Sequence, residues 1–492
     1  MVEGLLGAFI SILAPFNLIL LFIGTGLGIL VGALPGLSSP MAIIVLLPLT
    51  YSMETLPAFL TMIGVYVGTK LGGSYPAILL RTPGTPAGAC TALDGYPMAQ
   101  RGEPGLALGY ATMGSTFGGF FGWILAVTCV PLLSSIAVKS SNADIALIGI
   151  LGLIMVSAFV RGSTLRGLIG VVLGLLIATV GLDPIQTTSR FTFGYYNLMS
   201  GIPFAAALVG FFGIAVVLSD IKMMGRPSHL VTSRLNLALP KWKDLIARWQ
   251  CILIGGLYGT GIGAIPGVGA EVSPWIAYAT IRNKSKTPEQ FGSGIAEGIL
   301  TPEATNNANT GGTMIPMLAL GIPGDGSTAI MLGAMVLHGL EPGVMLMKNS
   351  SDIVYGILVG ILLSTFFMFL ISWQAIRYFV LILRFDRSWL FPFILIFATL
   401  GAFLTMNTTF PVFIAITFGL IGYIFESRKF PVVTVVLGII LGPIIEQNIR
   451  LALALSKNDW YTFVATWPRK VMVAAILGLL AYEIYKGLTT KS

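Results

Sequence analysis

Long apolar stretches, separated by short polar segments, run through the whole chain. A run of about 20 apolar residues is long enough for a helix to cross the hydrocarbon core of a bilayer. Uninterrupted stretches that approach or exceed this length cover 105–134, 145–160, 167–182, 201–219, 353–376, 388–406, 409–425, 430–446 and 470–487. Further apolar stretches are interrupted by Gly and Pro, at 16–53, 56–90, 250–281 and 295–337. The pattern predicts an all-α polytopic membrane protein with about 11–14 membrane segments, several of them broken or re-entrant.

Basic residues between these segments give them an orientation. Lys and Arg are concentrated in cytoplasmic loops of membrane proteins. With one crossing per uninterrupted span, one face receives Arg161 and Arg166, the basic loop 220–249, Arg384 and Arg387, and Arg428 and Lys429. Loops 183–200 and 448–469 then lie on the opposite, extracytoplasmic face. We therefore interpret 220–249 as a cytoplasmic loop and not as a second domain.

Short motifs recur in the same order in the two halves of the chain. The sequence Gly-Ala-Leu-Pro-Gly-Leu at 32–37 returns as Gly-Ala-Ile-Pro-Gly-Val at 263–268, an offset of 231 (263 minus 32). The Pro-Gly pair at 83–84 returns at 323–324, an offset of 240 (323 minus 83). Several matches at nearly one spacing indicate a repeat, with residues 1–249 as the first copy and 250–492 as the second copy plus a C-terminal helix. In the predicted orientation, matching spans run in opposite directions, which is typical of the inverted-topology repeats of secondary transporters.

The Gly-Pro interruptions predict the binding sites. Unpaired backbone groups in lipid cost several kcal/mol each, so such breaks persist only inside protein or beside a wet cavity. A helix that restarts there directs its free N–H groups at an anion, while carbonyls at the preceding helix end suit a cation. The expected substrate-binding residues are Pro83, Gly84, Thr85, Asn306, Asn307, Thr310, Pro323 and Gly324. The expected cation-binding residues are Gly36, Gly267, Asn309 and Asp325.

Several of these features have an alternative interpretation. The polar residues of 301–313 can also form a hydrophilic loop at the membrane interface, and a Gly-Pro break can be a simple kink. Arg81 either snorkels to the interface or faces an anionic substrate. Asp94 and Asp325 can each be a cation ligand, a protonation site or a turn residue. For Asp94 the turn is favoured, because its Asp-Gly-Tyr-Pro sequence is typical of one. His338 is expected to be a packed or interfacial residue, whereas Glu271 directly follows a break and can reach the cavity.

Composition excludes most soluble classes. Of the 492 residues, 55% are hydrophobic and only 10% are charged, against roughly a quarter charged in an average soluble domain. The net charge of +8 is explained by cytoplasmic loops, so nucleic acid is not an expected partner. Cys90, Cys129 and Cys251 lack metal-type spacing, so we expect no metal site. The N-terminal stretch reads as a retained membrane segment and not as a signal peptide.

Other classes of function find little support in the motifs. With two histidines and no HExxH or Walker lysine motif, the sequence predicts no catalytic residue and no enzyme. A passive channel is the other alternative to a transporter. A channel would conduct without saturation or an imposed ion gradient, and the two can be separated only by measuring transport.

Three segments resemble the large membrane subunit of the tripartite tricarboxylate transporter family, the TctA type. They are GALPGL…LLPLT (32–50), AILLRTPGTPAGACTALDGYPMAQRGEPG (77–105) and PEATNNANTGGTMIPMLALGIPGDG (302–326). The resemblance implies import of citrate-like tricarboxylates or related carboxylates by an alternating-access, elevator-like mechanism. The expected coupling ion is sodium, with no other cofactor. Implied partners are a small membrane subunit (TctB type), a periplasmic solute-binding protein (TctC type) and lipids of the cytoplasmic (inner) membrane.

Overall fold

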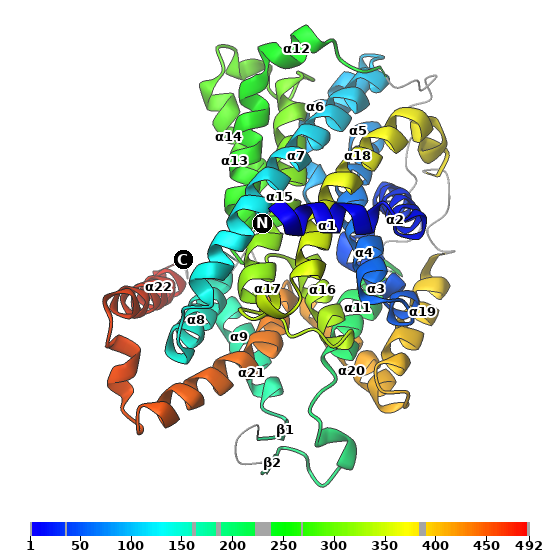
Figure 1. Cartoon of the computed structure of the whole chain (residues 1–492). Helices are drawn as coiled ribbons and strands as arrows, with labels where there is room; N and C mark the ends of the chain where they lie inside the picture. The colour runs from blue at the N-terminus through cyan, green and yellow to red at the C-terminus, as the bar shows by residue number, and fades with distance from the viewer. Residues whose placement is uncertain are drawn as a thin grey trace.

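The computed structural model describes residues 2–34, 37–159, 164–183, 188–221, 238–266, 269–382 and 390–489. Helices account for nearly all the regular structure of these residues. The one small sheet among them pairs β1 (Gly181–Leu182) antiparallel with β2 (Ser189–Arg190). The all-α fold that was predicted from the apolar pattern is therefore confirmed (Figure 1).

The helices of the first half follow the predicted segments closely. They are α1 (Val2–Ile12), α2 (Pro15–Ala33), α3 (Ser39–Tyr51), α4 (Thr55–Gly72), α5 (Ser74–Leu80), α6 (Gly88–Gln100), α7 (Pro104–Ala137), α8 (Asn142–Phe159), α9 (Thr164–Ala178), α10 (Phe204–Val209) and α11 (Ala215–Ile221). A π-helical turn at Gly210–Ile214 joins the last two, and a 3₁₀ turn lies at Tyr196–Leu198.

The second half is also built almost entirely of helices. Its helices are α12 (Trp242–Ala247), α13 (Trp249–Gly263), α14 (Gly269–Lys284), α15 (Glu297–Leu320), α16 (Gly326–Leu337), α17 (Leu346–Asn349), α18 (Ser351–Ile382), α19 (Leu390–Leu404), α20 (Phe410–Ser427), α21 (Val432–Leu455) and α22 (Trp467–Thr489). Short 3₁₀ turns lie at Pro288–Gln290 and Trp460–Val464. In both halves the interrupted apolar stretches are divided between consecutive helices, at the Gly-Pro motifs.

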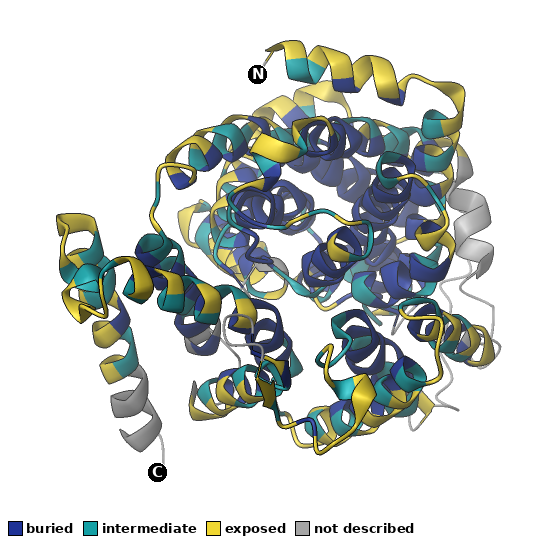
Figure 2. Cartoon of the chain, turned by 60° about the horizontal axis from the view of Figure 1, so that its bottom comes forward, coloured by how far each residue is buried: buried dark blue, intermediate teal, exposed yellow. Residues whose placement is uncertain are grey.

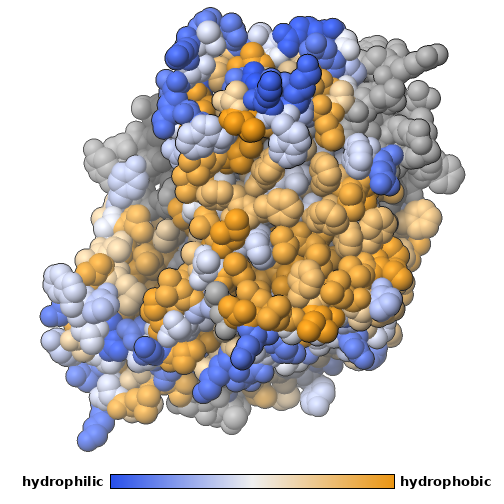
Figure 3. All heavy atoms as spheres, turned by 45° about the horizontal axis from the view of Figure 1, so that its top comes forward, coloured by the Kyte–Doolittle hydropathy of each residue, from blue (hydrophilic) through white to orange (hydrophobic). Residues whose placement is uncertain are grey.

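The surface is that of a membrane protein. Among the described residues, five helices are long and apolar enough to cross a bilayer, namely α2, α7, α18, α20 and α21, and further apolar helices are shorter. Figure 3 shows a broad hydrophobic band between two hydrophilic ends of the molecule. Large apolar side chains such as Leu132 and Phe413 are exposed on this outer surface. The residues buried within the protein lie mostly in the central helices (Figure 2).

Close helix packing on glycine brings α2 against α4. A Cβ atom added to Gly28 would lie 2.4 Å from the carbonyl oxygen of Val65, and Gly24 and Gly32 face Thr61 and Thr69 in the same way. Small residues spaced by four allow two helix backbones to approach closely in a membrane protein. The two helices therefore form a tightly fitted pair.

The same packing recurs between α13 and α15. Gly255 faces Thr301, Gly259 faces Thr305 and Gly263 faces Asn309. The glycines are offset by 231 positions (259 minus 28) and their partners by 240 positions (305 minus 65) from the α2–α4 pair. The two halves thus share a helix-pair packing as well as a sequence pattern, whereas the inversion of one half relative to the other stays a prediction.

Two contacts join loops that the charge pattern places on the same face. Figure 1 shows α12 at the opposite end from β1 and β2. The Arg166 guanidinium donates to the Arg428 carbonyl oxygen at 3.2 Å, and both residues are predicted to be cytoplasmic. At the other face, Arg450 Nη1 lies 2.7 Å from Asp183 Oδ2.

Candidate functional site between the helix breaks

The breaks after α5 and after α15 have the same backbone geometry. The residue that follows each helix is left-handed, Arg81 with φ 56° and Gly321 with φ 71°. In both breaks the next N–H donates to the carbonyl of the proline six positions earlier, at 3.2 Å. In each break a backbone N–H beyond the left-handed residue thus satisfies a carbonyl of the last helical turns. The breaks at Pro83-Gly84 and Pro323-Gly324 are therefore equivalent structures in the two halves.

The glycine of each Pro-Gly pair packs closely against a helix, Gly84 against α2 and Gly324 against α15. A Cβ at Gly84 would lie 2.1 Å from the Gly32 carbonyl oxygen, and a Cβ at Gly324 would lie 2.7 Å from Thr313 Cα. The Gly84 N–H donates to the Gly73 carbonyl at 3.0 Å, so this amide is already engaged. Glycine is needed at both positions for close backbone approach, and the Gly84 amide is not an available anion donor.

The polar residues of 301–313 lie in the middle of α15 and are buried inside the protein. Glu303, Asn306, Asn307, Asn309 and Thr310 each expose 1% or less of their surface. The alternative interpretation, a hydrophilic loop at the membrane interface, is therefore wrong. The reason is that α15 packs between α7 and α13, whose glycines leave room for its backbone.

A buried ion pair lies beside α15. Lys70 Nζ is 3.7 Å from Asp325 Oδ2, and the two side chains are 4% and 12% exposed. The Tyr66 hydroxyl donates to Asp325 Oδ2 at 2.7 Å and lies 2.9 Å from Thr313 Oγ1. The Lys70 ammonium also lies 4.9 Å from the centroid of the Tyr66 ring, within reach of a cation–π interaction. Asn306 Nδ2 donates to the Lys70 carbonyl at 3.1 Å. We call Tyr66, Lys70, Asn306, Thr313 and Asp325 the central polar cluster.

Asp325 also begins α16. Its Oδ1 accepts the Thr328 N–H at 2.9 Å, and the Thr328 hydroxyl accepts the Asp325 N–H at 2.9 Å, which is a capping box. The same carboxylate thus holds the restarting helix with one oxygen and faces Lys70 and Tyr66 with the other. The second Pro-Gly break is thereby attached to α4 of the first half.

The break between α2 and α3 also borders the cluster. Thr69, the neighbour of Lys70, donates its hydroxyl to Ser39 Oγ at 2.6 Å, and Ser39 is the first residue of α3. A Cβ on Gly326, at the start of α16, would lie 3.2 Å from Pro40 Cγ. Breaks from both halves therefore meet at this point.

Asparagine amides on α15 carry buried polar atoms without partners. Within the described part of the chain, Asn306 Oδ1, Asn309 Oδ1 and both Asn307 amide atoms make no hydrogen bond. A buried unsatisfied polar group costs roughly 1–3 kcal/mol, so a native protein keeps one only for a reason. A bound ligand with its own donors and acceptors is such a reason.

The predicted substrate-binding residues lie on α15 and in the two Pro-Gly breaks. Asn306, Asn307 and Thr310 lie on α15, where the Thr310 hydroxyl donates to the Asn307 carbonyl at 2.6 Å. Thr85 is buried in the first break and accepts the Gly88 N–H at 3.4 Å. Pro83 and Gly84 lie in the same break, and Pro323 and Gly324 lie in the second.

Of the expected cation ligands, Asn309 donates through Nδ2 to the Gly259 carbonyl at 3.4 Å. Asp325 belongs to the central polar cluster. Gly36 and Gly267 lie outside the described residues. The role of each of these four residues in cation binding stays a prediction.

Sequence reasoning missed Lys70 and Tyr66. The signal for Lys70 was present, because a lysine within an apolar segment is costly and marks a functional site by default. Tyr66 carried no such signal, since an aromatic residue in an apolar helix is ordinary. Glu303 is one of the polar residues of 301–313, and the sequence predicted no role of its own for it.

Asp94 corrects one expectation. It lies within α6, is completely buried and accepts the N–H groups of Gly292, Gly294 and Ile295 at 2.8 to 3.0 Å. The Tyr278 hydroxyl donates to its second oxygen at 2.7 Å. The turn predicted here is therefore wrong, because tertiary hydrogen bonds to the carboxylate replace the local ones that would form a turn.

Two other residues with alternative interpretations lie away from the cluster. The Arg81 side chain is exposed, with its guanidinium carbon 5.9 Å from the centroid of the Tyr96 ring. His338 ends α16 and packs edge-on against Phe59, with ring centroids 6.0 Å apart. Glu271 lies in the first turn of α14, directly after the interruption at 263–268.

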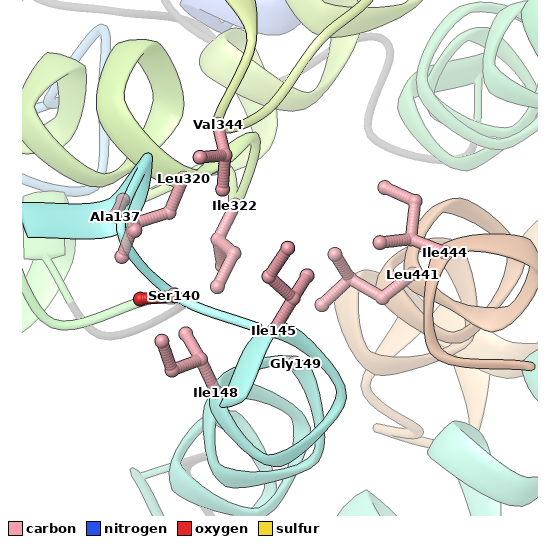
Figure 4. A pocket seen from close by; sticks show the side chains of 10 residues that line it. All are labelled: Ala137, Ser140, Ile145, Ile148, Gly149, Leu320, Ile322, Val344, Leu441 and Ile444. Carbon is pink, nitrogen blue, oxygen red and sulfur yellow. The ribbon is translucent and has the colours of Figure 1, made fainter. Parts of the chain in front are cut away.

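A small pocket beside the break at Pro323-Gly324 differs from the central polar cluster in having apolar walls. Leu320 and Ile322 line it together with side chains of α7, α8 and α21, and Figure 4 shows that these are aliphatic except for Ser140. An anion gains nothing from such walls. The pocket is a packing gap between helices and not a carboxylate site.

The helical fold, its hydrophobic band and a buried charged cluster between broken helices define a polytopic α-helical membrane protein with a polar site in its interior. Residues 18–437 match the tripartite tricarboxylate transporter TctA family, and the chain belongs to this family. The family is one of transporters with three components, of which TctA is the large membrane subunit.

Two relatives come from Agrobacterium vitis. One, described as "Uncharacterized 52.8 kDa protein in TAR-I ttuC' 3'region", is 32% identical over 491 residues, which cover 100% of this chain and 98% of the relative. The other, described as "Uncharacterized protein in TAR-II ttuC' 3'region", is 33% identical over 221 residues, 45% of this chain and 90% of the relative. No solved structure matches the chain.

Proposed function

We propose that this chain is the transport subunit of a binding-protein-dependent secondary transporter that imports citrate-like tricarboxylates or related carboxylates, coupled to a cation gradient, with sodium as the ion. Membership of the TctA family supports the transport of carboxylic acids. The observation that carries the proposal is the buried Lys70 on α4. Its backbone carbonyl accepts a hydrogen bond from Asn306 of α15, the helix whose asparagine side chains carry polar atoms without partners.

In the proposed mechanism the substrate carboxylate binds at the central polar cluster. Lys70 supplies the positive charge, and the amides of Asn306 and Asn307 supply hydrogen bonds. A charge-assisted hydrogen bond is roughly twice as strong as a neutral one, which favours an anion at Lys70. Pro83, Gly84 and Thr85, with Pro323 and Gly324, shape the two breaks that border the site.

Charge balance supports cation coupling. Lys70 and Asp325 already neutralise each other, so this pair has no net positive charge to balance the substrate. A multiply charged carboxylate would bring further negative charge into a site of low dielectric, where uncompensated charge is costly. Cations that enter with the substrate remove this cost and connect transport to their gradient.

Alternating access in this proposal follows from the two repeats. The equivalent glycine-packed pairs α2–α4 and α13–α15 carry equivalent breaks, and inverted repeats of this kind move relative to each other around a midplane site. We place the chain in the inner membrane with a TctB-type small subunit. A TctC-type binding protein would dock on the face that carries loops 183–200 and 448–469. The chain itself acts as a transporter and not as an enzyme.

The test is uptake of labelled citrate and of dicarboxylates into proteoliposomes that contain the chain and its small subunit, with the binding protein outside. Accumulation that saturates and requires an inward sodium gradient is expected, and Lys70→Gln should abolish it. Lys348→Gln, which neutralises an exposed lysine, serves as the matched control. Unsaturable flux without a gradient would instead indicate a passive channel.

A further inference from the structure

A second buried carboxylate lies on α15, apart from the central polar cluster. Glu303 is completely buried and accepts hydrogen bonds from three hydroxyls on three different helices. Thr91 of α6 donates to Oε1 at 2.5 Å, Ser115 of α7 donates to Oε2 at 2.7 Å, and Ser74 of α5 also donates to Oε1. All three hydroxyl residues are themselves completely buried. Four helices thus contribute oxygen atoms around this carboxylate.

The charge of this carboxylate is not balanced by a basic side chain. Among the ion pairs of the described residues, Lys70 pairs with Asp325, and none includes Glu303. A buried carboxylate without a counter-charge is strongly unfavourable, and hydroxyl dipoles compensate it only in part. A monovalent cation would balance the single charge of the ionised carboxylate.

Asn307 adds an independent observation. It follows Glu303 by four positions, so both side chains lie on the same face of α15, one helical turn apart. Asn307 is completely buried, and neither its Oδ1 nor its Nδ2 has a hydrogen-bond partner. An amide oxygen is a cation ligand, while an amide N–H₂ is a donor for a carboxylate. Asn307 can therefore serve a cation on one side and an anionic substrate on the other.

We propose that Glu303, together with Ser74, Thr91, Ser115 and Asn307, forms the binding site of the coupling cation. This inference rests on the proposed function and names the ion site within it. A set of oxygen ligands with a single carboxylate suits a hard alkali cation such as sodium and does not suit a transition metal. The hydroxyls donate to Glu303 when the site is empty, and rotation of each O–H turns a lone pair toward the bound ion. Asn307 then connects the ion to the substrate at Lys70.

The experiment measures sodium binding without substrate or partner subunits. Thermal unfolding of the purified full chain in detergent is followed as NaCl replaces choline chloride at constant ionic strength. A ligand that binds only the folded state raises Tm in a saturable way. We expect this rise in the wild type, and an apparent sodium affinity at least about tenfold lower in Glu303→Gln, equivalent to roughly 1.4 kcal/mol.

Two further variants make the result specific. Ser115→Ala removes one small ligand from α7 and should weaken sodium binding several-fold without unfolding the protein. Glu297→Gln makes the same chemical change on the same helix, at a carboxylate that pairs with Arg248 at 3.0 Å, and should leave sodium affinity unchanged.

A wild-type chain whose Tm does not respond to sodium would overturn the cation site, as would wild-type sodium affinity in a folded Glu303→Gln chain. Stability and uptake that depend on pH and not on sodium would also overturn it, because Glu303 would then bind a proton. A different outcome would contradict the proposed substrate without affecting the ion site. If no carboxylate is accumulated while the sodium response persists, the ion site stands and the proposed substrate is wrong.

Discussion

The Lys70 ammonium and the Asp325 carboxylate lie 3.7 Å apart and join α4 of the first half to the start of α16 in the second. They are separated by 255 positions in the sequence (325 minus 70). The pair therefore connects the two halves at the point where their broken helices meet. Lys70 also contacts α15, because Asn306 Nδ2 donates to the Lys70 carbonyl at 3.1 Å.

The Lys70–Asp325 pair is expected to stabilise the fold, and Lys70 is also expected to bind the substrate. The first prediction separates these two functions. Lys70→Gln leaves Asp325 as an uncompensated buried charge and should destabilise the protein by roughly 3–5 kcal/mol. Lys70→Gln with Asp325→Asn removes both charges while Asn keeps the helix cap, so most of the stability should return. Uptake should stay lost in both variants, because the cation that faces the substrate is missing. Thermal unfolding in detergent and uptake in proteoliposomes measure the two effects. A double variant that is as unstable as the single one would contradict this account.

Asn307→Ala gives the second prediction. Its amide makes no hydrogen bond in the structure, so removal should leave Tm unchanged or slightly higher while uptake falls at least about tenfold. Asn306→Ala is the comparison, because it loses the bond to the Lys70 carbonyl and should cost roughly 0.5–1.5 kcal/mol of stability. Normal uptake in a membrane-inserted Asn307→Ala chain would remove this residue from the site.

The glycine packing gives the third prediction, with a control on the same helix. Gly28→Ala would place a Cβ 2.4 Å from the Val65 carbonyl oxygen, whereas the nearest atom to a Cβ at Gly26 is 3.9 Å away. We expect Gly28→Ala to lose roughly 1–3 kcal/mol from overpacking, and Gly26→Ala to gain about 0.5–1 kcal/mol from helix propensity. Thermal unfolding of the two variants decides the point. Equal stabilities would show that α2 and α4 are not held in this close contact.

The equivalent position in the second half provides the fourth prediction. A Cβ at Gly259 would lie 2.3 Å from the Thr305 carbonyl oxygen, whereas Gly261 has no atom within 4 Å. Gly259→Ala should therefore lower Tm and Gly261→Ala should not, in parallel with the first half. If only one of Gly28→Ala and Gly259→Ala lowers Tm, the two helix pairs are not packed in the same way.

An ion network on the predicted extracytoplasmic face gives the fifth prediction. Arg190 Nη1 lies 2.6 Å from Glu446 Oε1 and 3.7 Å from Asp183 Oδ2. The contact with Glu446 holds β2 to α21. Arg190→Gln should raise the rate at which added protease cleaves residues 188–200 in right-side-out vesicles, more so at low salt where the native network is strongest. Lys457→Gln, a change at an exposed lysine on the same face, is the control. Cleavage only in inverted vesicles would reverse the predicted topology.

Local sequence patterns were sufficient for the helices and their breaks because each depends on nearby residues. Apolar runs such as 353–376 became helices since backbone groups in lipid must bond within their own segment. Pro83-Gly84 and Pro323-Gly324 ended helices because proline lacks a donor and glycine tolerates a close backbone contact. The turn predicted at Asp94 failed because distant N–H groups at 292–295 satisfy its carboxylate.

The sequence by itself determined the membrane class, the positions of the broken helices and the polar character of 301–313, since hydropathy, Gly-Pro motifs and residue type are local properties. Tertiary structure alone decided that Lys70 meets Asp325, that Glu303 gathers three hydroxyls, and that the Asn307 amide is left without partners. These contacts join residues up to 255 positions apart (325 minus 70). They follow from the close packing of helices on small residues, and no short stretch of sequence records which distant helix a given face will meet.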